Sequence, residues 1–285
     1  MTTYAVTGAT GHYGPIAVEQ LLARGVVPGD IVAIARSPEK ADALAGAGVE
    51  VRLGDYDRPE TLAPALAGVD RLLLVSGSEV GSRVPQHTAV IEAAKAASVG
   101  HILYTSVLRA DTTTLVIAPE HTATEKVIAA SGIPHTFLRN GWYAENYAAA
   151  APQHLARGVI THAAGDGRIA AATRADLAEA GAVALLSKEP REVYELAGPS
   201  FTYADLAATL TEITGTPVEA RAVSAEQLTA TLQEAGLDAG TAGFLTAVDT
   251  GIAQGELDGD TADLESLLAR PATPLADVLR AALAA

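Results

Sequence analysis

Three glycines, each separated from the next by two residues, follow a short apolar segment near the start of the chain. In such a turn Gly8 permits the sharp bend out of a strand, Gly11 lets the backbone approach a phosphate, and Gly14 lets the following helix pack closely on the sheet. A diphosphate would lie on the free amides at the positive end of that helix. The spacing matches the usual glycine fingerprint only loosely, but the strand before it and the helix after it favour a dinucleotide site over a turn without a ligand.

Arg36 occupies the position that separates the two nicotinamide cofactors. A site that prefers NADH places an acidic residue about 20 residues after the glycine turn, where it binds the ribose hydroxyl. In this chain Arg36 follows the second predicted strand, and Lys40 lies one helical turn further on. Because a guanidinium can bind the 2′-phosphate with two hydrogen bonds, the sequence predicts NADPH; the alternative is a solvated loop arginine.

Three further segments follow predicted strands and would line the same cofactor. Asp55 could bind the adenine amino group, or it could cap the turn before Pro59. The small polar turn from Ser76 through Gly77 to Ser78 would let the middle of the cofactor pass close to the backbone. Arg83 either reaches a phosphate or lies on the surface.

The chain lacks the residue pair used for alcohol and ketone chemistry. Many short-chain dehydrogenases place a lysine four residues after a tyrosine to lower the tyrosine pKa, and none of the eight tyrosines here has that lysine. Gly-x-Ser-x-Gly and His-Glu-x-x-His are absent too, which argues against a hydrolase or a zinc protease. Hydride transfer to an electrophile such as a quinone fits these absences, because the reduced oxygen is resonance-stabilised and collects protons from water.

Residues 139–147 put an amide and aromatic rings where a nicotinamide should lie. We assign Asn140 and Gly141 to the cofactor. Trp142 and Tyr143 either face the acceptor or pack between lobes, and Tyr143 and Tyr147 should share one helical face.

Two residues elsewhere could also reach the site. His121 is either a late proton donor, a wall of the acceptor pocket or a structural histidine. Arg174 would point back toward the cleft from the start of a helix that Thr173 or Asp176 caps.

Apolar segments of strand length alternate with amphipathic segments over residues 1–147. We expect an opening strand and strands at 31–35, 49–53, 71–75, 101–105 and 135–138, with helices at 15–23, 39–45, 59–66, 84–97 and 120–130. This order predicts a doubly wound parallel α/β sheet of six strands, a Rossmann domain that binds NADP.

Residues 148–285 should form a smaller α+β lobe, some segments of which can return to the first domain. Strands are expected at 159–162, 193–196 and 218–222, and helices at 175–186 and 203–213. The tail from Ser224 is helical and acidic, and we expect its carboxylates to be solvated surface. A substrate would lie between the lobes, at the carboxyl edge of the sheet.

Composition removes several classes of function. The chain has no cysteine, which excludes disulfides, thiolate catalysis and Cys-ligated metals. A net charge of −15 argues against a nucleic-acid partner. No apolar run is long enough for a membrane span and no signal peptide is visible, so we expect a cytoplasmic protein. The oligomeric state, a homodimer included, stays open.

The whole chain resembles the type 2 NAD(P)H:quinone oxidoreductases, which belong to the NmrA-like, atypical short-chain dehydrogenase group together with triphenylmethane dye reductases. The resemblance rests above all on the glycine turn, on residues 31–36, 73–81 and 104–106, and on the distinctive runs 139–147 and 172–176. Gly77 departs from the serine that is common there. The resemblance implies a Rossmann domain that holds NADPH, a small lobe, and a quinone above the nicotinamide near residues 140–143.

Residues and resemblance together give a predicted site without a metal. The reaction is assigned to Asn140, Tyr143 and His121, and the cofactor to Gly8, Thr10, Gly11, His12, Tyr13, Gly14, Arg36, Lys40, Asp55, Ser76, Gly77, Ser78, Arg83, Arg139, Asn140, Gly141, Trp142, Tyr143 and Arg174. The leading hypothesis is two-electron reduction of quinones by NADPH. A regulatory protein that senses NADP(H) without catalysis, and a reductase of dyes or other electrophiles, are the alternatives.

Overall fold

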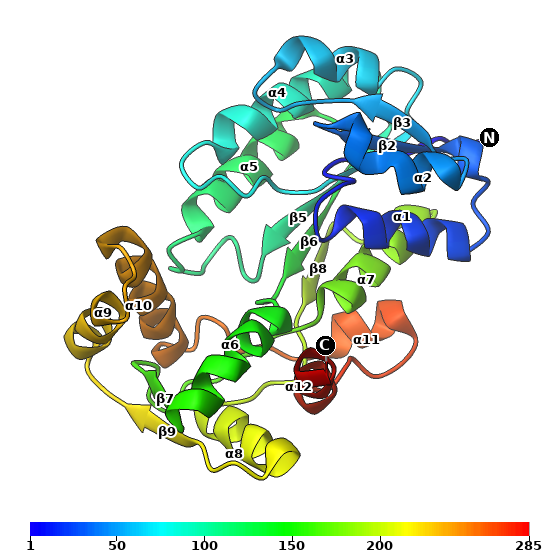
Figure 1. The fold of residues 1–285 in the computed structure, drawn as a ribbon. Coiled ribbons are helices and arrows are strands. Elements are labelled where there is room, and N and C mark those ends of the chain that lie inside the picture. The colour runs from blue at the N-terminus through cyan, green and yellow to red at the C-terminus, as the bar shows by residue number, and fades with distance from the viewer. Residues whose placement is uncertain (285) are drawn as a thin grey trace.

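Seven parallel strands form the central sheet of the computed structural model, which describes residues 1–284 apart from the side chains of residues 38 and 39 (Figure 1). The order across the sheet is β3-β2-β1-β4-β5-β6-β8. The strands are β1 (Tyr4–Val6), β2 (Ile31–Ala35), β3 (Glu50–Leu53), β4 (Arg71–Leu74), β5 (His101–Val107), β6 (His135–Asn140) and β8 (Val193–Leu196). The order reverses between β1 and β4, which is where doubly wound sheets bind ligands.

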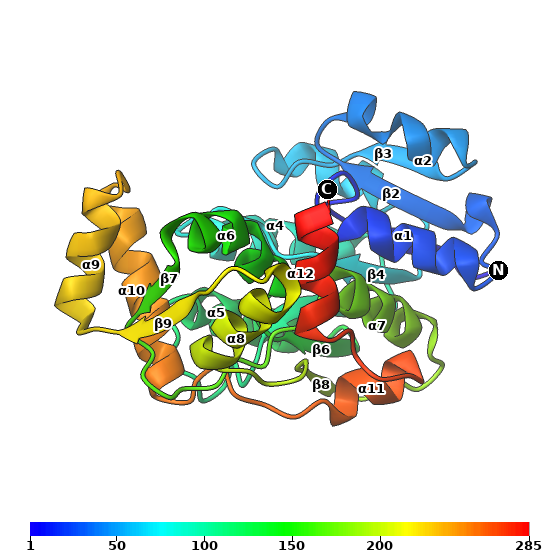
Figure 2. The ribbon, with the colours of Figure 1, turned by 60° about the horizontal axis from the view of Figure 1, so that its bottom comes forward.

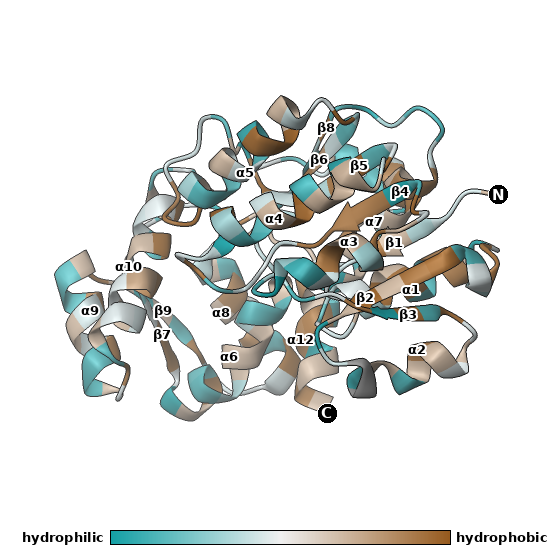
Figure 3. Ribbon diagram, turned by 90° about the horizontal axis from the view of Figure 1, so that it is seen from above, coloured by the Kyte–Doolittle hydropathy of each residue, from teal (hydrophilic) through white to brown (hydrophobic). Residues whose placement is uncertain are grey.

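Alternating side chains bury both faces of this sheet. Val6, Leu73 and Leu103 pack under α1 (Gly14–Ala23) and α7 (Arg174–Leu186). The opposite face, with Leu72 and Ile102, is covered by α3 (Leu62–Ala65), α4 (Arg83–Ala96) and α5 (Ala118–Ser131). The central strands are accordingly the most hydrophobic part of the ribbon (Figure 3). This two-sided burial explains why their sequences read as continuous apolar runs.

The prediction of six strands in this sheet was wrong by one. Strand β8, expected in the smaller lobe, pairs in parallel with β6 and places Leu196 beside Asn140. Helix α7 packs on α1, and α11 (Ala262–Leu268) packs on α7, so these segments also return to the first domain. The partner of a parallel strand lies far away in the sequence, which gives no local signal for such a return. The predicted boundary at residue 147 stays a prediction.

The smaller lobe is built on a second parallel sheet of two strands, β7 (Val159–His162) and β9 (Glu219–Ala222). Helices α6 (Ala144–Arg157), α8 (Tyr203–Thr214) and α12 (Leu275–Ala284) pack together beside it, while α9 (Ala225–Glu234) and α10 (Ala239–Ala253) form a pair at its far end (Figure 2). Short helical turns or helices at Pro28–Asp30 (η1), Pro38–Ala41 (η2), Asp42–Gly46 (α2) and Pro59–Thr61 (η3) complete the chain. Among residues 1–284, no helix is long and apolar enough to cross a bilayer.

The acidic tail is more than solvated surface, contrary to expectation. Glu256 accepts hydrogen bonds from the hydroxyls of Thr113 (2.7 Å) and Thr114 (2.9 Å). The carboxylate of Asp263 accepts a bond from the amide of Glu195 on strand β8 at 2.9 Å. The tail is therefore tied to the loop after β5 and to strand β8 of the central sheet.

Candidate cofactor cleft

The glycine turn has the shape that a diphosphate requires. Gly8 has a φ of +60°, and the Gly11 amide donates to the Gly8 carbonyl at 2.9 Å. A Cβ on Gly14 would lie 2.4 Å from that same carbonyl oxygen, so only glycine lets helix α1 begin so close to the turn. No side chain caps the amino end of α1, and because Pro15 has no N–H, the first-turn amides free for a ligand are those of Gly14 and Ile16.

Tyr13 supports the turn from behind. Its hydroxyl donates to the Leu177 carbonyl of helix α7 at 2.8 Å, and the residue is buried. Gly181 makes room for it, because a Cβ there would lie 2.4 Å from the hydroxyl. Tyr13 therefore lines the cleft but commits its hydroxyl to α7, which leaves its backbone and ring face for the cofactor.

A cleft of about 510 Å³ runs from this turn along the carboxyl edge of the sheet. It gathers fourteen of the predicted residues: Gly8, Thr10, Gly11, His12, Tyr13, Arg36, Lys40, Asp55, Ser76, Gly77, Ser78, Arg83, Tyr143 and Arg174. Four of these are cations, in a chain whose net charge is −15. The basic residues are therefore concentrated where an anionic cofactor would lie.

The sequence analysis missed seven residues that also line the cleft: Ser37, Gly54, Tyr56, Asp57, Val75, Glu79 and Gln86. Most of them follow β2, β3 or β4, and residues that follow the strands of a parallel sheet are expected to line a ligand site. Their position in the sequence could therefore have identified them. Gln86 is different, because it reaches the cleft from helix α4.

Arg36 lies in the open part of the cleft, near Lys40. Its Nη1 pairs with the Glu79 carboxylate at 3.4 Å, and the side chain is 64% exposed. It is thus neither buried in the fold nor pointed away from the cleft, and it is free to turn toward a phosphate.

Asp55 combines the two roles considered for it. Its carboxylate accepts from the Asp57 amide at 3.1 Å and its carbonyl accepts from the Arg58 amide at 3.0 Å, which closes the turn after β3. The residue also lines the cleft. The turn role is therefore present without a ligand, and the adenine contact stays a prediction.

The turn after β4 is held from below by side chains. The Ser76 amide donates to Thr105 Oγ1 at 2.8 Å, and the Gly77 amide donates to His87 Nε2 at 2.9 Å. Arg83 Nε donates to the Gly77 carbonyl at 2.7 Å. These polar backbone groups are engaged inside the protein, so the turn offers a cofactor a fixed surface for close packing.

Arg83 is a support of the cleft rather than a surface residue. Its side chain is only 11% exposed and lies 3.8 Å from the Glu120 carboxylate. Its Nη1 has no hydrogen-bond partner among the described residues. A phosphate oxygen could still use that nitrogen.

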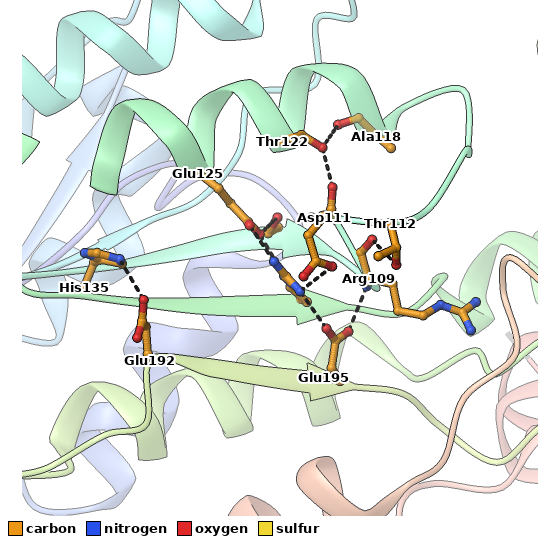
Figure 4. A network of polar contacts seen from close by, with 12 residues as sticks. Arg109, Asp111, Thr112, Ala118, Thr122, Glu125, His135, Glu192 and Glu195 are labelled. Carbon is orange, nitrogen blue, oxygen red and sulfur yellow. Dashed lines mark hydrogen bonds and ion pairs between the residues drawn. The ribbon is translucent and has the colours of Figure 1, made fainter. Parts of the chain in front are cut away.

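Arg139 does not enter the cleft. Its guanidinium binds Glu125 through Nε (3.1 Å) and Nη2 (2.8 Å), and its Nη1 binds Asp111 at 2.9 Å and Glu195 at 3.0 Å. The three carboxylates come from α5, the loop after β5 and strand β8, and Figure 4 shows them turned toward one guanidinium. Burial opposes the charge but the carboxylates prevail and raise the pKa of Arg139 above its usual value. Its role is structural.

Asn140 stands out at the end of strand β6. The side chain is buried, yet neither its amide nitrogen nor its amide oxygen has a hydrogen-bond partner among the described residues. Such an unpaired group costs about 1–3 kcal/mol, which a ligand with a matching amide would recover. Asn140 is not among the residues that line the cleft, but it lies close enough to Tyr143, which does line it, for its side chain to oppose the rise in the pKa of Tyr143.

Gly141 is required for packing and lies outside the cleft. A Cβ there would lie 2.6 Å from the Ala170 carbonyl and 3.2 Å from the Leu196 carbonyl, and the Gly141 amide donates to Leu196. Gly14 acts in the same way behind the turn. Trp142 packs against the core of the smaller lobe, which is the packing role considered for it.

The prediction that Tyr143 and Tyr147 share a helical face was wrong. Tyr143 is extended, with a ψ of 124°, and precedes helix α6, whereas Tyr147 lies within the helix and packs edge-on against Phe201. Tyr143 lines the cleft, and the guanidinium of Arg174 lies over its ring, 4.4 Å from the ring centre. Thr173 caps α7 by accepting from the Asp176 amide. Tyr143 and Arg174 thus form one wall of the cleft.

His121 is buried behind the cleft and is not among its lining residues. Its Nδ1 lies 2.8 Å from the Tyr104 hydroxyl. Burial, with help from the charge of Arg83, lowers the pKa of His121 to about 3, so the ring is neutral near pH 7. This geometry favours the structural role over that of a charged proton donor.

The cleft fits a nicotinamide dinucleotide on three counts. The glycine turn leaves space that a Cβ would fill, four cations line the cleft, and the buried amide of Asn140 lies beside the lining residue Tyr143.

Comparison with known proteins agrees with this geometry. The model of a family described as NAD(P)H-binding matches residues 8–189. Quinone oxidoreductase 2 of Escherichia coli (strain K12) is 50% identical over 276 residues, which is 96% of either chain. The crystal structure of the NADPH-dependent quinone oxidoreductase of Escherichia coli with NADPH superposes with a TM-score of 0.95, at 47% identity, over 99% of this chain and 100% of that one.

A dye reductase is similar as well. The structure of Citrobacter triphenylmethane reductase with NADP(H) gives a TM-score of 0.93 at 36% identity, over 98% of this chain and 100% of that one. Similarity of this extent confirms the predicted fold class.

Proposed function

The chain belongs to the NAD(P)H-binding family, and we propose that it is an NADPH-dependent quinone oxidoreductase. The resemblance predicted from the sequence is thereby confirmed. The observation that carries the proposed activity is a glycine-lined cofactor cleft with the buried Asn140 amide behind its wall at Tyr143, an amide that has no hydrogen-bond partner among the described residues. The match with quinone oxidoreductase 2 over 96% of the chain supports the same reaction.

Different residues of the cleft bind different parts of the cofactor in this proposal. The first-turn amides of helix α1 hold the diphosphate, and Arg36 with Lys40 binds the 2′-phosphate. Asn140, whose buried amide lies beside Tyr143, would bind the carboxamide of the nicotinamide and orient it. NADPH supplies the hydride when it is bound, and the protein supplies orientation.

Tyr143 and Arg174 form the wall against which an acceptor ring would lie. Burial raises the pKa of Tyr143 above its usual value, so its hydroxyl stays protonated near pH 7 and can donate a hydrogen bond to a quinone oxygen. Arg174 is held by the carboxylate of Glu145 at 3.5 Å and by the Asn146 side chain at 3.2 Å. Protons for the reduced quinone come from water, which fits the neutral, enclosed state of His121.

Steady-state oxidation of NADPH with benzoquinone and menadione tests the proposal. We expect turnover with both acceptors, a fall in the hydride-transfer rate of Asn140→Ala that exceeds its loss of NADPH affinity, and weaker NADPH binding in Arg36→Ala with little change for NADH. Tight binding of NADP⁺ and NADPH without turnover would instead support a protein that senses the cofactor. A cytoplasmic location is part of the proposal.

Dye reduction is a second candidate activity, favoured by the similarity to triphenylmethane reductase over 98% of the chain. A cationic triphenylmethane dye is, like a quinone, an electrophile that accepts hydride without prior protonation. Bleaching of such a dye with NADPH, compared with menadione reduction by the same preparation, ranks the two activities.

A further inference from the structure

A carboxylate stands inside the cofactor cleft beside the cation assigned to the 2′-phosphate. Glu79, in the loop after β4, accepts a hydrogen bond from Arg36 Nη1 through its Oε1 at 3.4 Å. Both side chains line the cleft and are about half exposed or more, at 48% and 64%. An anion that binds Arg36 must therefore meet the Glu79 charge at close range.

The Glu79 carboxylate is held in this position by a second contact. Its Oε2 accepts from Gln86 Nε2 at 3.1 Å, and the same nitrogen donates to Asp57 Oδ1 at 2.8 Å. Gln86 is buried, with 6% of its surface exposed, and comes from helix α4. Its amide thus ties together the loops after β3 and β4, while Arg36 adds the loop after β2.

The missing side chain of Gly77 leaves space for the Gln86 side chain beside Glu79. A Cβ on residue 77 would lie 3.0 Å from Gln86 Oε1, which is tighter than ordinary van der Waals contact. The glycine at this position therefore leaves room for the glutamine amide that holds Glu79. The contacts of Arg36, Glu79, Gln86 and Asp57 form one polar chain across the entrance to the adenine end of the cleft.

We propose that Glu79 is a selectivity residue, which competes with the 2′-phosphate for Arg36 and so lowers the affinity for NADPH without lowering that for NADH. NADH has a hydroxyl at this position and leaves the Arg36–Glu79 pair intact, whereas a phosphate must displace it and also feels the repulsion of the carboxylate. Lys40, in the same cleft, partly offsets that repulsion. The inference rests on the proposed role of Arg36.

Binding of two cofactor fragments to the full-length protein tests this inference without any turnover. The probes are 2′,5′-ADP, which carries the phosphate in question, and 5′-AMP, which lacks it, both measured by isothermal titration calorimetry. In Glu79→Gln we expect two- to fivefold tighter binding of 2′,5′-ADP, which is about 0.4–1 kcal/mol and lies within the range for an exposed ion pair, and no change for 5′-AMP. The gain should shrink at high salt.

Glu60→Gln is the matched control. It removes an exposed carboxylate that pairs with Arg58 at 3.2 Å outside the cleft, so it changes net charge equally without touching Arg36. We expect no gain in 2′,5′-ADP affinity there. In an Arg36→Ala background the Glu79→Gln gain should largely disappear.

The outcomes separate the inference from the function on which it rests. Weaker 2′,5′-ADP binding in Glu79→Gln, or an equal change for both fragments, would overturn the inference, because Glu79 would then position Arg36 or shape the adenine site. Unchanged 2′,5′-ADP binding in Arg36→Ala would overturn the phosphate assignment itself. Circular dichroism of each variant shows that the fold is retained.

Discussion

Substitution of Arg139 tests most directly whether a predicted site residue binds the cofactor or stabilises the fold. The sequence places it beside the cofactor, while the structure surrounds its guanidinium with Glu125, Asp111 and Glu195. We therefore expect Arg139→Met to destabilise the fold and to leave the cofactor affinity of the folded protein nearly unchanged. A contact with the cofactor would produce the opposite result.

The magnitude follows from the burial of each partner. Arg139 and Glu125 are 9% and 8% exposed, whereas Asp111 and Glu195 are 63% and 37% exposed. The two exposed pairs are worth about 0–1 kcal/mol each because water screens them. Removing the guanidinium from Glu125 leaves a buried carboxylate whose remaining partner is the Ser106 hydroxyl at 2.6 Å, a change that costs about 3–5 kcal/mol.

Urea unfolding of the protein without cofactor measures this loss, and fluorescence titration with NADPH measures the affinity. In the double variant Arg139→Met with Glu125→Leu, no buried charge is left alone, so most of the lost stability should return. A loss below about 1 kcal/mol in Arg139→Met would refute the reasoning about burial. A large loss of NADPH affinity at unchanged stability would return Arg139 to the cofactor site.

Two further predictions concern the glycine turn and the buried histidines. Gly14→Ala should weaken NADPH binding and lower the free energy of unfolding by about 1–3 kcal/mol, because its Cβ would lie 2.4 Å from the Gly8 carbonyl oxygen. Gly29→Ala is the control, since a Cβ there would have no atom within 4 Å other than those of its chain neighbours. Equal effects of the two substitutions would contradict the packing argument. The free energy of unfolding should fall as the pH drops from about 6.5 toward 4, since burial lowers the pKa of His87 to about 4 and of His121 to about 3, and the unfolded chain takes up protons first. Each histidine contributes up to about 1.4 kcal/mol per pH unit in that window. His121→Gln should therefore reduce the slope of the free energy of unfolding against pH, measured by urea unfolding. An unchanged slope would show that His121 is not buried in its neutral form.

The sheet and the phosphate turn could be predicted because their signals are local. The apolar runs at β2 and β7 predicted the strand bounds without error, and the glycine turn predicted the NAD(P)H-binding family that the comparison shows. Strand β8 was recognised as a strand, but its pairing with β6 depends on a return of the chain that no spacing encodes.

The roles of single side chains depended on partners that are distant in the sequence. Arg139 looked like a cofactor residue because its carboxylates, at 111, 125 and 195, converge on it only after folding. Tyr143 and Tyr147 have helical spacing, yet helix α6 begins at Ala144, after Tyr143. The acidic tail had no visible partner until Thr113 and Thr114 met Glu256.

The two ends of the cleft are built with different rigidity. At the hydride end, Asn140 is fixed by its neighbours: its carbonyl accepts from the Leu108 amide, and the next residue, Gly141, donates to Leu196. The segment of the smaller lobe at Ala172 then pairs with Tyr143. Backbone bonds from three segments therefore set the distance from the amide to the acceptor wall.

At the adenine end the structure relies on exposed side chains instead. Arg36 and Glu79 are linked by one long contact of 3.4 Å, and both sit on loops. Substitutions there should change cofactor affinity and choice while hydride transfer from bound cofactor keeps its rate, because no backbone bond of Asn140 passes through those loops. The choice of cofactor can thus be altered separately from the reaction. A substitution at Gly141 must instead disturb the reaction geometry itself, because its Cβ would lie 2.6 Å from the Ala170 carbonyl.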